Sequence, residues 1–352
     1  MTGEHTVQDA TEIVASQSPL PESMKNKILV FEYLHADADL SRQVDPSMRG
    51  EGRGMLEGVL CDLSGIHNVE ATVACSEPAS TEFENFGAAH FVIDSEGPVQ
   101  TGKALSEAAS QFDAVIPIAP ECRGMLTSTV GAVRAAGHLV IAPSNDNIDI
   151  CCDKWKTWER LHAAGIPTVR TMLPPEVTTS GDWLQKPRDG TGGGGIVPFR
   201  PGENPAVPSI VQPRLSGTSH SVSIIGTGDP EKPLVLPAAD QDISWHSGEP
   251  RYHGSCVPSE VIPKDESHAV AVMISRCLHH AFGYLNVDLF HSSAEGLQVL
   301  EINPRISSTY IAYRQLAEFN LMEAMLAPVL QLSVKRTAPE VWKNRNVRQS
   351  FH

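Results

Sequence analysis

Short apolar segments alternate with helix-like segments through the first 147 residues, and this alternation most constrains the fold. Strands that alternate with helices indicate a parallel sheet covered by helices on both faces. Strands are predicted at residues 27–33, 70–74, 90–93, 113–118 and 138–141, and helices through 54–63, 103–111 and 123–136. We expect residues 25–147 to form one α/β domain, preceded by a disordered lead-in at residues 1–24.

The pattern changes after residue 147, where Gly/Pro turns and short strands become frequent. A helix at 152–164 is expected to end at Gly165-Ile-Pro167, because glycine and proline stop helices. The elements expected after it are antiparallel strands within 183–256, a helix at 265–282, strands at 285–290 and 297–302, and a helix at 310–330. Residues 333–352 carry five Lys or Arg side chains and are expected to be a solvated basic tail, with a partner contact as the alternative.

The composition argues against two classes of partner. A formal net charge of −15 repels the nucleic-acid backbone and anionic membranes. No apolar run reaches the roughly 18 residues of a membrane span, and the N-terminus does not resemble a signal peptide. The seven cysteines form no metal-spaced CxxC pair, so ordinary thiols are expected, with Cys151-Cys152 as a ligand or redox pair as the alternative. We therefore expect a cytoplasmic protein without nucleic-acid or membrane partners.

A glycine-rich segment, Gly190–Gly195, directly follows the sequence Lys186-Pro-Arg-Asp189. It satisfies the G-x-G-x-x-G pattern of dinucleotide-binding turns, but it does not open a βαβ unit and no helix-like sequence follows it. It also lacks the Gly-Lys-Ser/Thr end of a Walker loop. We interpret it as a strand ending in a lysine, followed by a glycine hairpin whose backbone N–H groups can close over phosphates. The alternative is a simple linker.

Three oxygen donors are predicted on two neighbouring strands near the end of the chain. Strand periodicity puts Asn286 and Asp288 on one face of the first strand, and Glu301 and Asn303 on one face of the second. Asp288, Glu301 and Asn303 suit Mg²⁺, which takes few protein ligands and keeps positions for phosphate oxygens. The alternative is a buried carboxylate pair satisfied by salt bridges. Lys154, on an earlier predicted helix, is a further candidate cation, although a lone helix lysine is usually solvated.

Together these features resemble the ATP-grasp superfamily over about residues 145–332. The resemblance implies a fold of mixed α/β and α+β class, with an N-terminal parallel α/β pre-ATP-grasp domain before a two-lobed ATP-grasp domain. The implied bounds are residues 25–147 for the first domain, 148–212 for the small lobe, 213–332 for the large lobe and 333–352 for the tail. It also implies ATP as the nucleotide and Mg²⁺ as the metal, with Mn²⁺ as a substitute.

The same resemblance gives roles to individual residues. Lys154 and Lys186 match the two lysines that bind the nucleotide. The other implied ATP contacts are Gly190, Gly192, Gly193 and Gly194 in the loop, and Gln212 and Leu215 in the hinge strand that holds adenine. The implied metal ligands are Asp288, Glu301 and Asn303. Two positions depart from the family, because Gln212 replaces a common Glu and Ser219 replaces a common acidic ribose contact.

Within the superfamily, the sequence resembles the tyramine–glutamate ligases of methanofuran biosynthesis. The shared segments are residues 31–33 (FEY), 51–56 (EGRGML), 118–121 (IAPE) and 301–310 (EINPRISSTY). The resemblance implies an amide bond between the glutamate side chain and tyramine or tyrosine, formed through an acyl phosphate, in a methanofuran-like cofactor pathway of one-carbon metabolism. The alternatives are another ATP-grasp amino-acid or dipeptide ligase and, from a different class, a non-catalytic nucleotide-binding regulator.

The implied reaction needs a cation at the reacting carbonyl and a pocket for the acceptor. Arg305, just past the metal ligands, is the candidate for holding the acyl phosphate together with Lys186, and a structural ion pair is the alternative for Arg305. The candidate substrate residues are Glu32, Arg53, Glu121, Gln241, Tyr252, Ser307 and Tyr310. The expected partners are small-molecule carboxylate and amine substrates, and a homodimer is left open.

Overall fold

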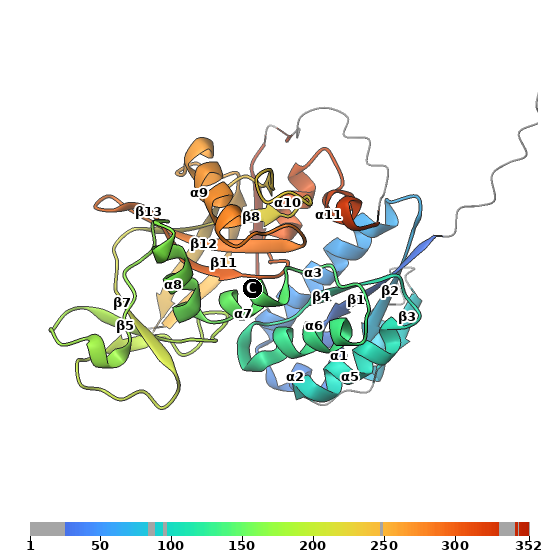
Figure 1. The fold of residues 1–352 in the computed structure, drawn as a ribbon, viewed down its shortest axis with the longest axis horizontal. Helices are drawn as coiled ribbons and strands as arrows, with labels where there is room; N and C mark the ends of the chain where they lie inside the picture. The colour runs from blue at the N-terminus through green and yellow to red at the C-terminus, as the bar shows by residue number, and fades with distance from the viewer. Residues whose placement is uncertain are drawn as a thin grey trace, which may run out of the picture.

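The computed structural model describes residues 25–83, 89–93, 97–246, 249–330, 342–343 and 345–351. The predicted lead-in at residues 1–24 lies outside these residues, as do residues 333–341 of the predicted tail. Figure 1 shows an α/β domain at the right and a second region, built around antiparallel sheets, at the left. The predicted mixed fold, in which a parallel sheet precedes antiparallel ones, is confirmed.

The described strands of the first domain form a parallel sheet in the order β3 (Ala89–Val92), β2 (Val69–Cys75), β1 (Asn26–Glu32), β4 (Ala114–Ile118). The described helices are α1 (Tyr33–Ala36), α2 (Ala38–Gln43), α3 (Pro46–Ser64), α4 (Glu77–Phe83), α5 (Gly97–Ala109) and α6 (Met125–Ala135). On β1, Ile28 and Val30 pack in one core with α3, whereas Leu29 and Phe31 pack in another with α5 and α6. Both faces of β1 are buried, as its unbroken apolar sequence predicts.

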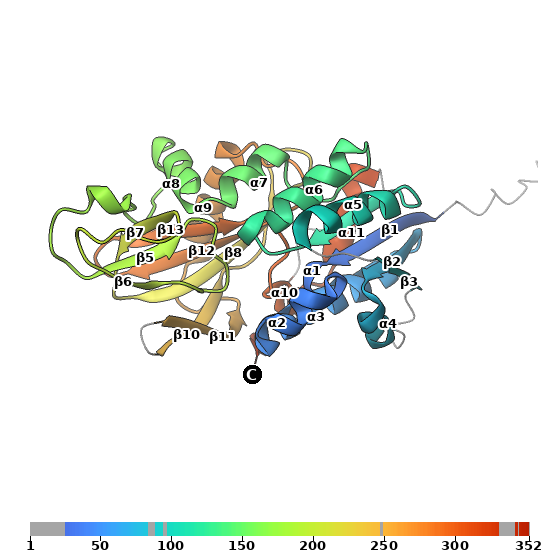
Figure 2. The same cartoon turned by 90° about the horizontal axis from the view of Figure 1, so that it is seen from below.

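The second region contains two antiparallel sheets and several helices. The smaller sheet has the order β6 (Val197–Phe199), β5 (Trp183–Pro187), β7 (Ser209–Pro213). The larger has the order β13 (Gly296–Asn303), β12 (Tyr284–Ser292), β8 (Thr218–Ile225), β10 (Ala239–His246), β11 (Glu249–Val257), β14 (Val347–Ser350), with β9 (Leu234–Val235) beside β8. The described helices are α7 (Asn145–Cys151), α8 (Lys154–Ala163), α9 (Lys264–Cys277), α10 (Tyr310–Leu316) and α11 (Leu321–Leu330). The smaller sheet lies at the end of the molecule away from the first domain (Figures 1 and 2).

Strand β12 separates an apolar face from a polar one. Its alternate residues Leu285, Val287 and Leu289 are buried in a core with α8 and α9. Successive side chains of a strand point to opposite faces, so Asn286 and Asp288 lie on the other side. The polar face therefore follows directly from the alternation in the sequence.

Strand β13 reaches the same face through a β-bulge. Asp288 pairs with Glu301 and Leu289 with Val299, so Leu300 has no partner in the register. Because of this extra residue, Val299 and Ile302 are both buried in the core, and Glu301 lies across from Asp288 on the polar face. Bulges of this kind re-aim side chains, and this one brings two carboxylates together.

Two sequence-based element predictions differ from the structure. The helix predicted at 310–330 is wrong as a single element, because it divides into α10 and α11. Asn320 lies between them, and its Oδ1 accepts a hydrogen bond from Glu323 N (3.0 Å), so it caps the second helix. The strand predicted at 138–141 is reduced to one parallel bridge between Val140 and β4.

The described part of the predicted tail adds a strand to the larger sheet, while its cations Lys343, Arg345 and Arg348 are exposed. β14 pairs with β11 at the edge of the larger sheet, and the Phe351 ring lies 6.2 Å from the Tyr252 ring. Lys343 Nζ (2.9 Å) and Arg345 Nη2 (3.0 Å) both donate to the carbonyl of Gln315. This carbonyl is in the last turn of α10, where helix carbonyl groups lack partners and cations are favoured.

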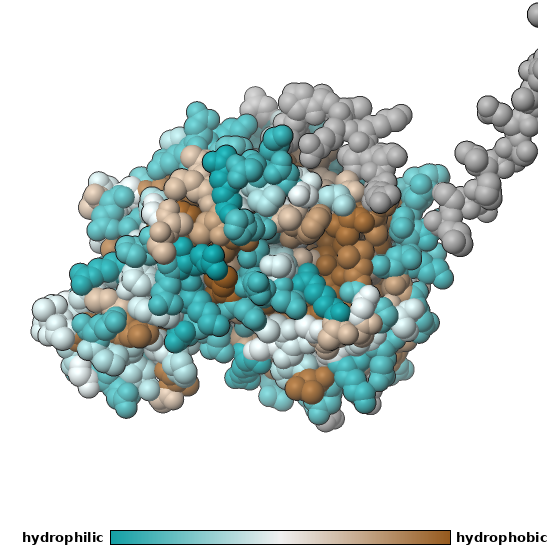
Figure 3. All heavy atoms as spheres, in the orientation of Figure 1, coloured by the Kyte–Doolittle hydropathy of each residue, from teal (hydrophilic) through white to brown (hydrophobic). Residues whose placement is uncertain are grey.

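The outer surface is mainly hydrophilic on the face shown in Figure 3, and the largest hydrophobic area there lies over α11. Helix α11 is apolar along most of its length and packs in one core with α3. In the part of the chain that the structure describes, no helix is both long and apolar enough to cross a membrane.

Asp62 on α3 connects the first domain to the C-terminal helices. Its carboxylate accepts hydrogen bonds from the Tyr310 hydroxyl and from Arg314 Nε (3.0 Å), and Arg314 Nη2 lies 2.9 Å away. Its main-chain carbonyl accepts a further bond from Asn320 Nδ2 (2.6 Å). Since Tyr310 is fully buried, its hydroxyl depends on this carboxylate for a partner.

Replacing Asp62 with Ala is expected to lower the free energy of unfolding by about 2–4 kcal/mol, because the Tyr310 hydroxyl and the Arg314 guanidinium lose their partner. Chemical denaturation measures the change. Asp39→Ala is the control, because the Asp39–Arg42 pair is exposed (55% and 66%) and its loss should cost less than about 1 kcal/mol. Equal losses in the two variants would contradict the proposed role of Asp62.

Candidate active site

Lys186 lies near the end of a strand that runs into a glycine hairpin. β5 pairs antiparallel with β6, and the glycine loop, residues 188–196, joins them. Three glycines of the loop have positive φ, 63° at Gly192, 75° at Gly193 and 75° at Gly195. Residues with a Cβ rarely adopt this conformation, so glycines permit the path of this loop.

An ion pair joins the segments that carry the two lysines. Arg188, two residues after Lys186, donates to Asp153 through Nε (2.9 Å) and Nη2 (2.5 Å). The Arg188 carbonyl accepts a hydrogen bond from the backbone N–H of Lys154 (2.9 Å). Asp153 also caps α8 by accepting from Trp155 N (2.9 Å). The start of α8 is therefore fixed to the end of β5.

The side chain of Lys154 contacts both the glycine loop and the larger sheet. Its Nζ lies 2.9 Å from Glu301 Oε2 and donates to the Gly190 carbonyl (2.5 Å). Asp288, across the strand pair from Glu301, accepts hydrogen bonds from three side-chain amides, those of Gln241 (2.9 Å), Asn286 (3.1 Å) and Asn303 (2.9 Å). The structure thus brings Lys154 together with the three predicted metal ligands.

The charges of this cluster depend on one another. Burial lowers the pKa of Lys186 to about 8, despite the nearby carboxylates, and the charge of Lys154 acts in the same direction. Burial, with the Glu301 carboxylate beside it, raises the pKa of Asp288 above its usual value. Burial alone would also raise the pKa of Glu301, but the two lysines bring it below its usual value. A phosphate bound here would raise the pKa of Lys186, and a metal ion would lower that of Asp288.

Arg305 forms an ion pair with Glu121, which was the alternative to a catalytic role for this residue. Its Nε lies 2.8 Å from Glu121 Oε1, its Nη2 donates to Glu121 Oε2 (3.1 Å), and its Nη1 donates to the Ile306 carbonyl (3.2 Å). A guanidinium has five N–H groups, so two remain for a ligand. Arg305 also lines a cavity of about 90 Å³ together with Thr191 and Gly192 of the glycine loop. The ion pair therefore orients Arg305 without using it fully.

This cavity, called the acceptor cavity below, lies at the carboxyl ends of β1 and β4. β2 and β4 lie on opposite sides of β1, so the strand order reverses there. Open parallel sheets bind ligands at such a point. The lining residues used below are Glu32, Glu51, Gly52, Pro120, Thr191 and Arg305.

The predicted substrate residues do not all lie at the acceptor cavity. Glu32 lines it, and Glu121 pairs with Arg305, which also lines it. The side chains of Gln241 and Ser307 instead donate to Asp288 and Asn286, and Tyr252 shares a hydrogen bond with Ser255.

Two further predicted substrate residues have partners on α3. Arg53 pairs with Glu57 (2.6 Å) through a side chain that is 44% exposed, and Tyr310 donates to Asp62 in the core. Neither is among the residues that line the acceptor cavity.

Gln212 on β7 is buried, and only one end of its side-chain amide is satisfied. Nε2 donates to Thr171 Oγ1 (2.9 Å), whereas Oε1 has no hydrogen-bond partner within the described chain. A buried acceptor without a partner is unfavourable, so it marks a place where a donor from a ligand fits. Leu215 follows in a half-buried position just after the strand.

The glycine loop also contacts the first domain and the larger sheet. Asp189 Oδ2 accepts a hydrogen bond from the backbone N–H of Arg123 (3.2 Å). A Cβ on Gly192 would lie 3.3 Å from Met48 Cε on α3, and a Cβ on the next glycine would lie 3.0 Å from a proline of β11. The loop is therefore packed against α3, β11 and the segment that contains Arg123.

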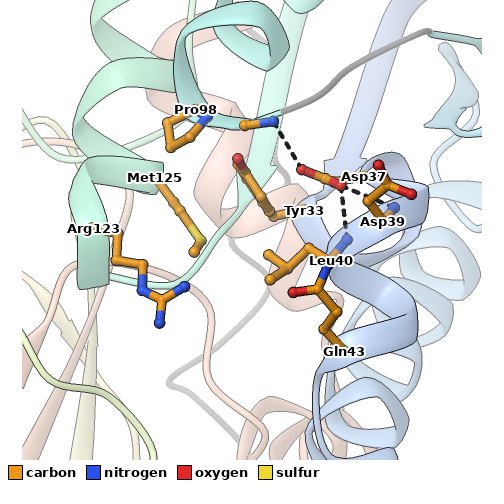
Figure 4. Close-up of a pocket in the computed structure, with 9 residues that line it drawn as sticks. Tyr33, Asp37, Asp39, Leu40, Gln43, Pro98, Arg123 and Met125 are labelled. Atoms are coloured by element: carbon orange, nitrogen blue, oxygen red, sulfur yellow. Dashed lines mark hydrogen bonds between the residues drawn. The ribbon is translucent and has the colours of Figure 1, made fainter.

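A second cavity, of about 310 Å³, lies beside α5 and α6. Figure 4 shows Arg123 and Met125 on one side of it, Asp37 and Leu40 on the other, and Tyr33 between them. The described residues that line it include none of the predicted site residues. The larger cavity is therefore separate from the cluster of lysines and carboxylates.

Two family models match separate parts of the chain. Residues 151–309 match the model of an ATP-grasp domain, and residues 69–148 match that of a pre-ATP-grasp domain. The fold is similar to that of a protein from Archaeoglobus fulgidus described as ATP-grasp superfamily, with a TM-score of 0.68, 22% identity and coverage of 86% of this chain and 88% of that one. The second region therefore contains an ATP-grasp domain, and the first contains a pre-ATP-grasp domain.

Two further solved structures show how widely this ATP-grasp fold is shared. One is the biotin carboxylase domain of the Hydrogenobacter thermophilus 2-oxoglutarate carboxylase, solved with MgADP and bicarbonate (TM-score 0.67, 14% identity, 89% of this chain and 71% of that one). The other is the N5-carboxyaminoimidazole synthetase of Staphylococcus aureus with ADP (TM-score 0.64, 14% identity, 88% and 78%). No curated protein matches the sequence.

Reasoning from the sequence did not find the contacts that lock this ATP-grasp site together. Asp153 directly precedes Lys154, and Arg188 lies two residues after Lys186. This placement beside the two lysines is the sequence signal that points to the Arg188–Asp153 pair. Glu51 was identified only as part of a shared segment, yet it lines the acceptor cavity beside Arg305. Pairings between segments this far apart require the fold to be known.

Arg188→Ala is expected to speed amide hydrogen exchange in the glycine loop, because the start of the loop loses two hydrogen bonds to Asp153. Exchange followed by mass spectrometry on peptides covering residues 188–196 makes the measurement. Arg200→Ala is the matched control, since Arg200 is an exposed arginine just after the same hairpin. Unchanged protection in Arg188→Ala would show that the ion pair does not hold the loop.

Proposed function

We propose that this protein is a ligase that uses ATP and Mg²⁺ to join a carboxylate to an amine, with release of ADP and phosphate. The observation that carries the proposal is the convergence of Lys154 and Lys186 on Asp288 and Glu301 beside the glycine loop. Such a cluster offers cations to phosphate groups and carboxylates to a divalent metal. Phosphoryl transfer depends on both, because its catalysis is mainly positioning and charge stabilisation.

The nucleotide would lie between the hinge strand β7 and the glycine loop. The unpartnered Gln212 Oε1 can accept a hydrogen bond from the amino group of adenine, with Leu215 against the ring. Lys154 and Lys186 would hold the α- and β-phosphates, and the backbone N–H groups of the loop would close over them. The contacts of Lys154 with the loop and with Glu301 support this assignment, because they join the two sides of the nucleotide site.

The residues present fit a Mg²⁺ site. Asp288 and Glu301 face each other across two paired strands, and carboxylate oxygens are the ligands that Mg²⁺ prefers. Asn303 donates its Nδ2 to Asp288, so its Oδ1 is the oxygen that would complete the set. Burial and the neighbouring Glu301 carboxylate raise the pKa of Asp288, and a divalent cation bound there would lower it. When bound, Mg²⁺ would supply positive charge to the transferring phosphoryl group.

The chemistry would follow from the position of Arg305. A substrate carboxylate attacks the γ-phosphorus of ATP, ADP leaves, and an acyl phosphate forms. Arg305 has two N–H groups left for the acyl phosphate and for the oxyanion that develops when the amine attacks. Glu121 holds the guanidinium in place, which makes Glu121 a positioning residue in this scheme.

The proposed substrates are the side-chain carboxylate of glutamate and the amine of tyramine or tyrosine, for a methanofuran-like cofactor. The support is that the four sequence segments shared with tyramine–glutamate ligases meet at one place. Residues 31–33, 51–56, 118–121 and 301–310 each contribute at least one residue to the acceptor cavity. Their meeting at one cavity supports a common role for them there.

With Mg²⁺ present, the protein is expected to release ADP from ATP only when L-glutamate and either tyramine or tyrosine are added together. The product should have the mass of a γ-glutamyl amide. Release of ADP with a different carboxylate and amine would support the ligase function but contradict the proposed substrates. No release across a broad screen would contradict the ligase and favour a nucleotide-binding regulator.

Lys186→Ala and Glu301→Ala are each expected to abolish ATP turnover, because each removes a charge that faces the phosphates or the metal. Circular dichroism checks that the fold is retained. Lys232→Ala is the matched control, since Lys232 is 83% exposed and lies 4.0 Å from its partner Asp229. Turnover near the wild-type rate in either site variant would contradict the assignment.

Removing Mg²⁺ with a chelator is expected to stop ADP release, and adding back Mg²⁺ or Mn²⁺ should restore it. Asp288→Asn should need a higher metal concentration for half-maximal release, because it loses a charged ligand. Steady-state rates over a metal titration give this value. A titration curve identical to that of the wild type would show that Asp288 does not bind the metal.

A further inference from the structure

Two carboxylates of the first domain face the acceptor cavity. Glu32 ends β1 and Glu51 lies on α3, and both line the cavity with Arg305 and with Thr191 of the glycine loop. The cavity therefore connects the proposed phosphate site to the first domain. Its volume is about 90 Å³.

Glu32 is held in place with one oxygen turned to the cavity wall. Its Oε2 accepts a hydrogen bond from the backbone N–H of His35 (3.0 Å) and contacts His35 Nδ1. Its Oε1 lies against Gly52, where a Cβ would be only 2.7 Å away. Gly52 lines the same cavity, so the Glu32 carboxylate and this glycine lie side by side in its wall. A glycine at this position is what leaves room for the carboxylate.

Glu51 lies in a more open position on the same side. Burial raises the pKa of Glu51 above its usual value, although Arg305 and the Ser308 hydroxyl act in the opposite direction. The groups that face it come from three parts of the chain: Arg305 and Ser308 follow β13, Tyr252 belongs to β11 and Glu32 belongs to β1. A carboxylate of this kind can accept a proton near neutral pH more readily than an exposed one.

The acceptor cavity has more negative than positive charge. Among the described residues that line it, Arg305 is the cation that faces Glu32 and Glu51, and Arg305 is already paired with Glu121. Glu32 contacts His35, whereas Glu51 and Glu121 share one guanidinium. Buried carboxylates require compensating charge, and a cation on the ligand would supply it.

We propose that Glu32 and Glu51 form the subsite for the acceptor, a primary amine bound as its ammonium, and that Glu51 takes the proton that frees the nitrogen lone pair. This inference rests on the proposed ligase function and names the ligand of one half of that site. The ammonium gives one proton to Glu51. The nitrogen then forms the C–N bond as the bond between the carbonyl carbon and the phosphate oxygen breaks. The leaving phosphate takes the electron pair and accepts the second proton of the nitrogen.

The decisive experiment compares two acceptors in Glu51→Gln at neutral pH, with ATP, Mg²⁺ and L-glutamate present. Hydroxylamine is uncharged near neutral pH, so it attacks an acyl phosphate without a base and gives a hydroxamate. Tyramine is an ammonium and needs the base. Glu51→Gln is expected to form hydroxamate within about threefold of the wild type, but to form the tyramine amide about 10²–10⁴ times more slowly. The amide rate should recover partly as the pH is raised toward the pKa of the amine.

Glu107→Gln is the control, because Glu107 is an exposed carboxylate on α5 of the same domain (71% exposed). Equal loss of hydroxamate and amide in Glu51→Gln would overturn the inference by placing Glu51 in the first half-reaction or in the fold. Wild-type rates for both products would also overturn it. If the wild type forms neither product with L-glutamate or with other carboxylates, the ligase proposal itself fails, and the inference fails with it.

Discussion

The ion pair between Lys154 and Glu301 is the contact on which the rest of the site depends. It joins α8 to the larger sheet, and the same ammonium donates to the carbonyl of Gly190 in the glycine loop. Buried charges are stable only when they are paired, so each of these three parts fixes the position of the other two. The second ion pair, Arg188 with Asp153, holds the loop to α8 from the other side. Together the two ion pairs fix the residues proposed to bind phosphate relative to those proposed to bind the metal.

The proposed phosphate and metal residues all belong to the second region, whereas Glu32 and Glu51 of the proposed acceptor subsite belong to β1 and α3 of the first domain. The C-terminal helices hold α3 against the second region through Asp62, and the glycine loop meets α3 near Met48. A substrate in the acceptor cavity would therefore touch both domains at once. This division suits a ligase, because nucleotide activation and acceptor recognition can use separate surfaces that meet at one carbonyl carbon.

Much of the fold could be predicted, because local patterns of apolar and glycine residues determine many of its strands and turns. β1 reads as an unbroken apolar run since both of its faces are buried, and the glycine loop follows a strand as its sequence indicates. The failures have two causes. Asn320 divides one apolar helical pattern into α10 and α11 by capping Glu323 N, a local contact that the apolar pattern does not reveal. Residues 347–350 join a sheet edge whose partner strand is distant in sequence, so no local pattern announces it.

The sequence by itself determined the chemical groups of the site, namely two lysines, a glycine loop and three oxygen donors with strand spacing, because residue type and periodicity are local properties. Only the tertiary structure decided how those groups face one another. The bulge at Leu300 turns Glu301 toward Asp288 while Val299 and Ile302 stay in the core. The pairing of Arg305 with Glu121, and the meeting of Glu32 and Glu51 in one cavity, likewise required the fold. A side chain acquires its partners only when distant strands are brought into register.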